Sequence, residues 1–204
     1  MKKFELTTEF ITNALGKKLF RIKALVEFGS VKAGELGGYA EKEENISQDG
    51  NAWVSDDACV YGDAKVFGNA WVYGDAWVHG NAKVFGNAEV YGDAKVSDNA
   101  EVYGDAKVYG NAWVYGDAEV SGGAEVFGNA DYALVKGFGT EFRCTTFYRD
   151  KNKKIMVNCG CFHGDLKAFR KQVKETRSGK IAKEYLMIAD LMEYHFTSED
   201  SSDE

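Results

Sequence analysis

A six-residue alternation of apolar and polar positions dominates the middle of the chain. Valine recurs at every sixth position from Val54 to Val126, and an alanine stands two residues before each valine, from Ala52 to Ala124. A Gly-Asp or Gly-Asn pair separates most of these units. A fixed short period sustained over residues 50–131 is typical of a solenoid.

The alternation also predicts which side chains are inside. Successive side chains of a strand point to opposite faces, so each valine points one way and its two neighbours point the other way. Glycine in the turn pairs allows the positive φ of a sharp turn, and three sides would close a triangular coil of about eighteen residues. The neighbours of valine vary from lysine to tryptophan, whereas a narrow core needs a uniform filling. We therefore predict that valine and alanine fill the core and that the flanking side chains face outward.

An aliphatic residue followed four positions later by a small one, as in Val54 and Ala58, is the pattern that this segment repeats. In this respect residues 50–131 resemble the hexapeptide-repeat superfamily. The resemblance implies a left-handed parallel β-helix, and the handedness comes from the resemblance alone. Proteins of this superfamily commonly form parallel trimers, so a homotrimer is the first partner to expect.

The outward positions carry many aromatic residues, which align when the chain advances by eighteen. One column reads Ser55, Tyr73, Tyr91, Tyr109 and Phe127, a second Tyr61, His79, Ser97 and Tyr115, and a third Phe67, Phe85, Tyr103 and Ser121. Stacked rings could simply stabilise neighbouring coils. We favour an interface on at least one face, because such columns exceed the apolar area that a monomer normally exposes. The predicted contact residues are Trp53, Trp71, Trp77, Tyr73, Tyr91, Tyr109, Phe67 and Phe85.

The repeat segment is acidic. The chain has a net charge of −7, and residues 50–131 contain only four basic residues, Lys65, Lys83, Lys95 and Lys107. This balance argues against nucleic-acid binding by the β-helix, which would need basic contacts to phosphates. Asp57, Asp75 and Asp93 would stack along one edge of the prism. Their simplest role is to stabilise the turns, because aspartate side chains readily hydrogen-bond to the backbone there. The alternative is that the row of carboxylates imitates a nucleic-acid backbone and so inhibits a host nucleic-acid enzyme.

The segments outside the repeat predict two different ends. Residues 1–49 read as an N-terminal β cap with strands at 3–7 and 18–28, since solenoid ends expose core and need covering. Residues 132–197 read as a small α+β module, and residues 198–204 as an acidic disordered tail. The module would contain a hairpin (142–149 and 155–162) and helices at about 166–177 and 181–196, with the inward residues Leu166, Phe169, Val173, Tyr185, Ile188, Leu191 and Met192.

Two features of the module suggest partners. The stretch from Cys159 to Gly164, followed by a helix, resembles C-terminal modules on repeat proteins of bacteriophages and prophages. A basic stripe lies opposite the apolar face of the first helix, and it consists of Lys167, Arg170, Lys171, Lys174 and Arg177. Such stripes are mostly solvated faces, and the alternative is docking onto an acidic partner or a phosphate.

Two catalytic or metal sites remain as alternatives. Acyltransferases of the hexapeptide-repeat superfamily use a histidine outside the prism as general base with an acyl-CoA donor, which would make His79 the base here. No loop interrupts the repeat, however, and the column neighbours Tyr61 and Ser97 offer no carboxylate to orient the ring. Zinc could in principle bind Cys144, Cys159, Cys161 and His163, but their spacing is not that of a zinc knuckle, and cysteine is often a small buried apolar residue.

The sequence therefore predicts a mainly β protein, a left-handed parallel β-helix with a β N-terminal cap and a small α+β C-terminal module. We expect a non-enzymatic binding or structural protein without a cofactor, whose partners are copies of itself and, in a phage or prophage setting, a host protein. No apolar segment has membrane-spanning length or resembles a signal peptide, so we expect a cytoplasmic protein with reduced thiols.

Overall fold

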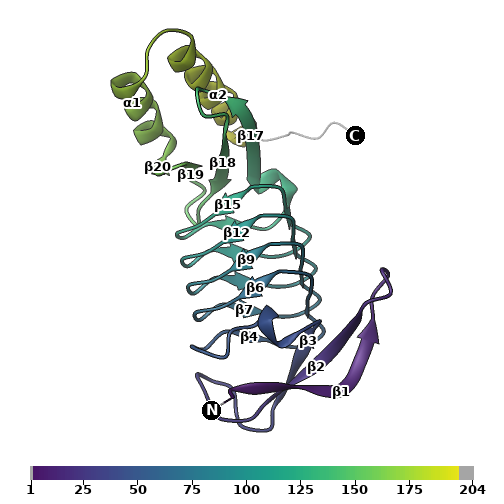
Figure 1. Ribbon diagram of the computed structural model, residues 1–204. Coiled ribbons are helices and arrows are strands. Elements are labelled where there is room, and N and C mark those ends of the chain that lie inside the picture. The colour runs from purple at the N-terminus through teal and green to yellow at the C-terminus, as the bar shows by residue number, and fades with distance from the viewer. Residues whose placement is uncertain (1, 198–204) are drawn as a thin grey trace, which may run out of the picture.

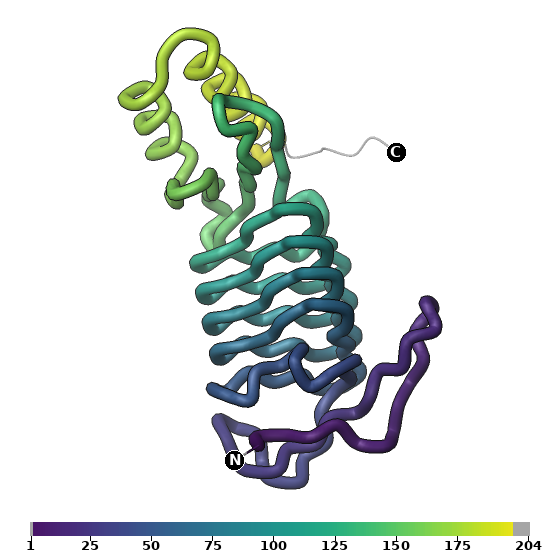
Figure 2. The backbone as a smooth tube through the Cα atoms, in the orientation of Figure 1, coloured from purple at the N-terminus to yellow at the C-terminus, as the bar shows by residue number. Residues whose placement is uncertain are grey.

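The computed structural model describes residues 2–197, and the predicted acidic tail, residues 198–204, lies outside the described residues. The middle of the chain is a stack of about five turns of short strands (Figures 1 and 2). A β-hairpin projects from the N-terminal end of the stack, and two helices lie at the other end. The predicted solenoid with a β N-terminal sheet and a hairpin-plus-helix C-terminal part is confirmed.

Each turn of the stack contributes two-residue strands to three parallel walls. The strands are β4 (Trp53–Val54), β5 (Cys59–Val60), β6 (Lys65–Val66), β7 (Trp71–Val72), β8 (Trp77–Val78), β9 (Lys83–Val84), β10 (Glu89–Val90), β11 (Lys95–Val96), β12 (Glu101–Val102), β13 (Lys107–Val108), β14 (Trp113–Val114), β15 (Glu119–Val120) and β16 (Glu125–Val126). We call β4-β7-β10-β13-β16 the first wall, β6-β9-β12-β15 the second wall and β5-β8-β11-β14 the third wall. Val90 pairs with Val72 and Val108, each eighteen residues away, as the sequence predicts.

Valine and alanine fill the core. The valines from Val54 to Val126 and the alanines from Ala52 to Ala124, at six-residue intervals, are all 0% exposed. Burial of each valine contributes about 1.5–3 kcal/mol, so the repeat itself supplies most of the apolar stabilisation of the rod. The predicted inward orientation is confirmed.

The turns stack backbone on backbone, which explains the glycines. Gly104 has a φ of 73°, and a Cβ there would lie 2.9 Å from the backbone nitrogen of Gly122 in the next turn. Asp98 replaces glycine at such a position with a φ of 58°, and its carboxylate accepts a hydrogen bond from the Gly116 N–H. Aspartate tolerates this conformation better than most residues.

The N-terminal sheet extends the third wall. Strands β1 (Phe4–Thr12) and β2 (Lys18–Ala24) form the hairpin, and β3 (Leu36–Ala40) pairs with β2 on one side and, in parallel, with β5 on the other. Strand β3 was not predicted, because its Gly-Gly pair resembles a loop. A Cβ at Gly37 would lie 2.5 Å from the Val54 carbonyl oxygen, so the close approach of this strand to the solenoid requires glycine.

The parallel strands of the stack form a ladder of backbone hydrogen bonds, and at its N-terminal end side chains pair with the carbonyl groups that the backbone leaves free. Each turn of the solenoid accepts hydrogen bonds from the turn before it, so the first turn has carbonyl groups without a backbone partner. The Lys3 ammonium donates to the carbonyl oxygens of Gly50 and Ala52 at 3.3 and 2.9 Å. The Asn45 amide, in the short 3₁₀ helix η1 (Glu43–Asn45), donates to those of Gly62 and Ala64.

The C-terminal module is a four-stranded antiparallel sheet with two helices. A short 3₁₀ helix, η2 (Asn129–Asp131), precedes β17 (Tyr132–Phe138), β18 (Arg143–Arg149), β19 (Ile155–Cys159), β20 (Phe162–Asp165), α1 (Leu166–Thr176) and α2 (Gly179–Thr197). Asp165 caps α1, as its Oδ1 accepts a hydrogen bond from the Ala168 N–H. Among residues 2–197, no helix is long and apolar enough to cross a membrane.

One inward residue of α2 was predicted wrongly. Leu191 is 58% exposed, whereas Ala189, Met192 and Phe196 are buried. The helical period explains the difference. Positions on one face of a helix are three to four residues apart, so the buried face of α2 runs through Tyr185, Ile188, Met192 and Phe196, and Leu191 lies beside it.

The module also completes the ladder at the C-terminal side. The Thr146 hydroxyl accepts a hydrogen bond from the Glu119 N–H at 2.9 Å, and the Asn158 amide donates to the Glu119 carbonyl oxygen at 2.9 Å. On the third wall, the Asn129 side chain accepts from the Trp113 N–H. These side chains provide the donors and acceptors that a further turn of backbone would provide.

Replacement of Asn158 by alanine tests this arrangement. Asn158 is 4% exposed, and its amide also donates to the Ser121 hydroxyl. Because the variant leaves the partly buried Glu119 carbonyl and the buried Ser121 hydroxyl without this donor, we expect the free energy of unfolding to fall by about 2 kcal/mol in denaturant titrations. Asn111→Ala, at an exposed turn, is the matched control and should change it little. Equal stabilities of the two variants would contradict this role of Asn158.

Lys3 predicts a pH dependence of stability. The side chain is almost completely buried, and burial lowers its pKa from 10.5 to about 8. Below pH 8 the Lys3 side chain is protonated in both the folded and the unfolded chain, so the folded chain bears the full cost of burying the charge. Above pH 8 the folded chain loses this proton first. The unfolded chain then binds more protons, and the free energy of unfolding rises with pH. Relative to Lys3→Met, the natural protein should gain about 2.5 kcal/mol between pH 7 and pH 10 in urea unfolding. A constant difference between the two proteins would show that Lys3 is not buried as a cation.

Candidate functional site

The first wall carries a continuous aromatic column. Tyr73, Tyr91 and Tyr109 stack with ring centroids 4.8 and 5.0 Å apart and ring planes within 9° of parallel. Phe127 follows edge-on at 5.4 Å and is 60% exposed. The spacing follows from the ladder, because residues eighteen positions apart lie one above another.

The columns on the other two walls are covered at one end. On the second wall, Phe67, Phe85 and Tyr103 stack at 4.8 and 4.9 Å, and the next position, Ser121, contacts the fully buried Tyr148 of the C-terminal module. The third wall has one stacked pair, formed by Tyr61 and His79 at 4.9 Å. Tyr61 is itself buried against Leu19, Tyr39 and Cys59 at the N-terminal end, and Ser97 interrupts the column by accepting a hydrogen bond from the Trp113 indole.

The predicted exposure of Trp53 is wrong. Trp53 does flank Val54, but it is 0% exposed because Phe4 and Phe28 of the N-terminal segment pack edge-on against its ring at 6.3 and 5.4 Å. Its indole nitrogen is buried, with no hydrogen-bond partner among the described residues. Trp71 and Trp77 are only partly buried, and the Lys95 ammonium lies 5.8 Å from the Trp77 ring centroid.

A groove begins where the N-terminal segment stops covering the first wall. Trp71 and Tyr73 line it together with the polar residues Ser30, Ser55, Asn69, Asn87 and Glu89. The Tyr73 hydroxyl donates to Glu89 at 3.0 Å, and the other oxygen of Glu89 forms an ion pair with Lys107 at 3.2 Å. Burial and the bond to Glu89 raise the pKa of Tyr73, so the phenol stays a neutral donor. The groove thus presents aromatic rings beside amide and carboxylate groups, which suits binding rather than proton transfer.

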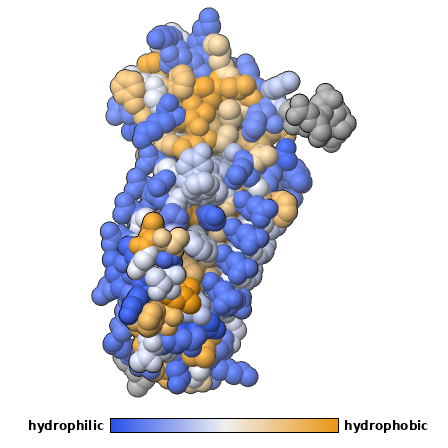
Figure 3. Space-filling view, turned by 90° about the vertical axis from the view of Figure 1, so that its right-hand side faces the viewer, coloured by the Kyte–Doolittle hydropathy of each residue, from blue (hydrophilic) through white to orange (hydrophobic). Residues whose placement is uncertain are grey.

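Apolar side chains also gather at the two ends of the molecule. Figure 3 shows them over the N-terminal hairpin and the C-terminal module, with mostly hydrophilic rod surface between. Phe10, Leu15, Phe142 and Met187 are among the exposed members of these groups. Sequence reasoning missed these surfaces, because each depends on how far the hairpin projects and on which side of α2 faces the sheet.

The edges of the prism differ in charge. One edge carries an amide ladder in which Asn51, Asn69 and Asn87 each donate to the next residue, ending at Asp105. The predicted acidic edge has Asp57, Asp75 and Asp93, which are all exposed. Asp57 lies 3.7 Å from Arg21, whereas Asp75 and Asp93 form no ion pair within residues 2–197.

His79 has no hydrogen-bonded catalytic partner among residues 2–197. The imidazole is stacked against Tyr61, and burial lowers its pKa. Within the described part of the chain, no carboxylate is hydrogen-bonded to the ring, although the Asp98 charge partly opposes the effect of burial. A general base needs such an orienting group, so nothing in this geometry favours the acyltransferase alternative.

The four candidate zinc ligands do not come together. Thr145, not Cys144, lies opposite Cys159 in the β18–β19 pair, so Cys144 points to the other face of the sheet. His163 contacts the Tyr148 hydroxyl at 3.2 Å and Cys161 is exposed. Among residues 2–197, no three His, Cys, Asp or Glu side chains form a group that could hold a metal ion, so this geometry does not favour the zinc alternative.

A comparison with protein families supports the repeat. The YdcK β-solenoid repeat matches residues 64–80, about one turn from β6 to β8, which includes the groove residues Trp71 and Tyr73. The chain is a β-solenoid repeat protein. No curated protein matches it. The match covers one turn of the repeat and indicates no function. The function of this solenoid protein must therefore be inferred from its walls and its two end modules.

Separate alanine substitutions of Trp53 and Trp71 test which tryptophan of the first wall is buried in the core and which is part of the surface. Trp53→Ala should lower the free energy of unfolding by about 3–5 kcal/mol, because it empties a fully buried site. Trp71→Ala, one turn further along the same wall, should cost clearly less, since that ring is partly exposed. Denaturant unfolding followed by circular dichroism measures both. A larger loss for Trp71→Ala than for Trp53→Ala would refute the burial described above.

Proposed function

We propose that this solenoid protein is a non-enzymatic binding protein that associates with copies of itself, as a homotrimer, through the first wall. The observation that carries the proposal is the open tyrosine column. The second column ends against Tyr148 and the third begins under the N-terminal sheet, whereas the column of Tyr73, Tyr91 and Tyr109 runs on to the exposed Phe127.

The physical properties of this column suit an interface. The rings are already held by stacking, so little conformational entropy remains to be lost on association. Aromatic side chains can each bury about 150–250 Å², and they are enriched at the centres of protein interfaces. The neighbouring Glu89 and Lys107 form an ion pair within the chain, so the charges beside the column are partly neutralised before any contact.

The proposal includes the finer structural class. An unbroken six-residue period, two-residue strands and the aliphatic-small pairing support a left-handed parallel β-helix of the hexapeptide type. This class implies parallel trimers through the resemblance described above, and in a parallel trimer the first wall of every copy could face the threefold axis.

A narrower proposal concerns a second partner. The exposed carboxylates of Asp57, Asp75 and Asp93 would suit a basic host protein in a phage or prophage setting. Such an interaction would weaken steeply with salt, because it would depend on exposed charges. The self-association proposed above is dominated by rings and should depend little on salt, so the two proposals are separable by ionic strength.

Charge substitution in the column tests the main proposal. We expect sedimentation equilibrium to give about three times the chain mass of 22.5 kDa for the natural protein, and the mass of a single chain for Tyr91→Glu or Tyr109→Glu. A buried carboxylate inside an aromatic interface lacks a partner, which is the reason for the dissociation. Asn111→Glu, at an exposed turn, is the control and should stay trimeric. A natural protein that sediments as a single chain would refute the trimer.

A further inference from the structure

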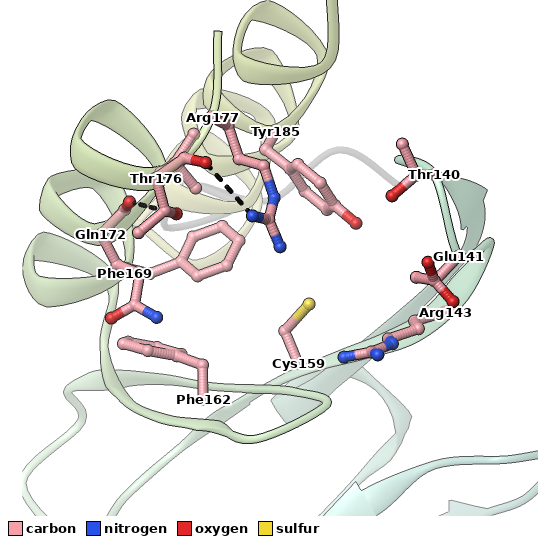
Figure 4. A pocket seen from close by; sticks show the side chains of 11 residues that line it. Thr140, Glu141, Arg143, Cys159, Phe162, Phe169, Gln172, Thr176, Arg177 and Tyr185 are labelled. Carbon is pink, nitrogen blue, oxygen red and sulfur yellow. Dashed lines mark hydrogen bonds between the residues drawn. The ribbon is translucent and has the colours of Figure 1, made fainter.

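The C-terminal module contains a cavity, partly open to solvent, that the proposed function does not use. It has a volume of about 70 Å³ and lies between the β17–β18 connection, β19 and the two helices. Figure 4 shows the Arg143 and Arg177 side chains entering it from opposite sides, with the Cys159 sulfur between them and the Tyr185 hydroxyl beside Arg177. These residues come from four separate segments, so no local sequence motif indicates the cavity.

Both arginines are exposed, and neither has a carboxylate partner among residues 2–197. Arg143 forms no ion pair among residues 2–197, and its guanidinium lies over Gly160, where a Cβ would be 2.5 Å from it. Arg177 donates to the Thr176 carbonyl oxygen at 3.2 Å and likewise has no ion pair in the described chain. By contrast, Arg170 of α1 forms ion pairs with both Asp190 and Glu193 of α2. Two guanidiniums that line one cavity, are accessible to solvent and are not engaged in ion pairs within residues 2–197 are available to bind an anion.

The remaining lining restricts the kind of anion. Glu141 also lies at the cavity, so the two arginines and this carboxylate carry a net charge of +1, which matches a monoanion better than a phosphate dianion. The apolar side of the cavity is formed by Phe162 and Phe169, whose ring centroids are 5.4 Å apart. The volume is about half that of a cavity known to hold benzene, so only a few carbon atoms fit.

We infer that this cavity binds a small aliphatic carboxylate, with its carboxylate between Arg143 and Arg177 and its hydrocarbon part against Phe162 and Phe169. Guanidinium groups bind carboxylates through paired hydrogen bonds, and the partly enclosed site strengthens these bonds relative to water. The Tyr185 hydroxyl already donates to the Phe138 carbonyl oxygen, so it forms part of the wall. The inference is independent of the first wall.

Titration of the full chain with propionate, followed by ¹H–¹⁵N NMR, tests the inference. We expect saturable shifts of residues around the cavity and a dissociation constant in the millimolar range. Arg143→Gln and Arg177→Gln should each weaken binding about tenfold or more. Glu141→Gln should strengthen it several-fold, because it removes a like charge. Lys174→Gln, on the outer side of α1, is the control and should bind as the natural protein does.

Two further ligands decide the chemical class. Propionamide, which has the same shape without the charge, should produce no saturable shifts. Inorganic phosphate should bind more weakly than propionate, and stronger binding of phosphate would overturn the assignment to a monoanion. Absence of saturable shifts with propionate, equal shifts with propionamide, or unchanged affinity in both arginine variants would overturn the site itself.

Discussion

The fold depends on satisfying the backbone at the two ends of a parallel ladder. Each turn of the solenoid donates to the next, so the interior turns need nothing beyond their own repetition, but the terminal turns expose unpaired groups. Lys3 and Asn45 supply donors at one end, and Thr146, Asn158 and Asn129 complete the other. Polar side chains, more than apolar coverage alone, therefore determine where the repeat can stop.

The same stacking that forms the ladder also forms the walls. Residues eighteen positions apart meet as rings, amides or opposite charges, as in the Tyr73 column, the Asn69 ladder and the pair of Lys83 and Glu101. A wall residue is thus held by its neighbours above and below before any ligand arrives. What distinguishes one wall from another is the covering that the end modules supply: Tyr148 lies at the end of the second column, and the N-terminal sheet covers the start of the third.

The repeat could be predicted because its six-residue period determines which side chains face inward and which residues lie one above another. Val54 to Val126 lie inside and the columns stand where the eighteen-residue spacing puts them. The ends could not be predicted in the same way. Trp53 has the same flanking position as Trp71, and only the tertiary position of Phe4 and Phe28 buries it. The cavity of Arg143 and Arg177 likewise depends on four segments meeting, which no spacing in the sequence encodes.

The eighteen-residue register makes the length of the rod a discrete quantity. Gain or loss of one whole coil would change the rod by about 4.8 Å and leave both end modules facing the same walls. Gain or loss of a single six-residue unit would instead rotate the C-terminal module by a third of a turn relative to the N-terminal hairpin. Duplication within the gene can therefore adjust reach and orientation separately, without a new core or new caps.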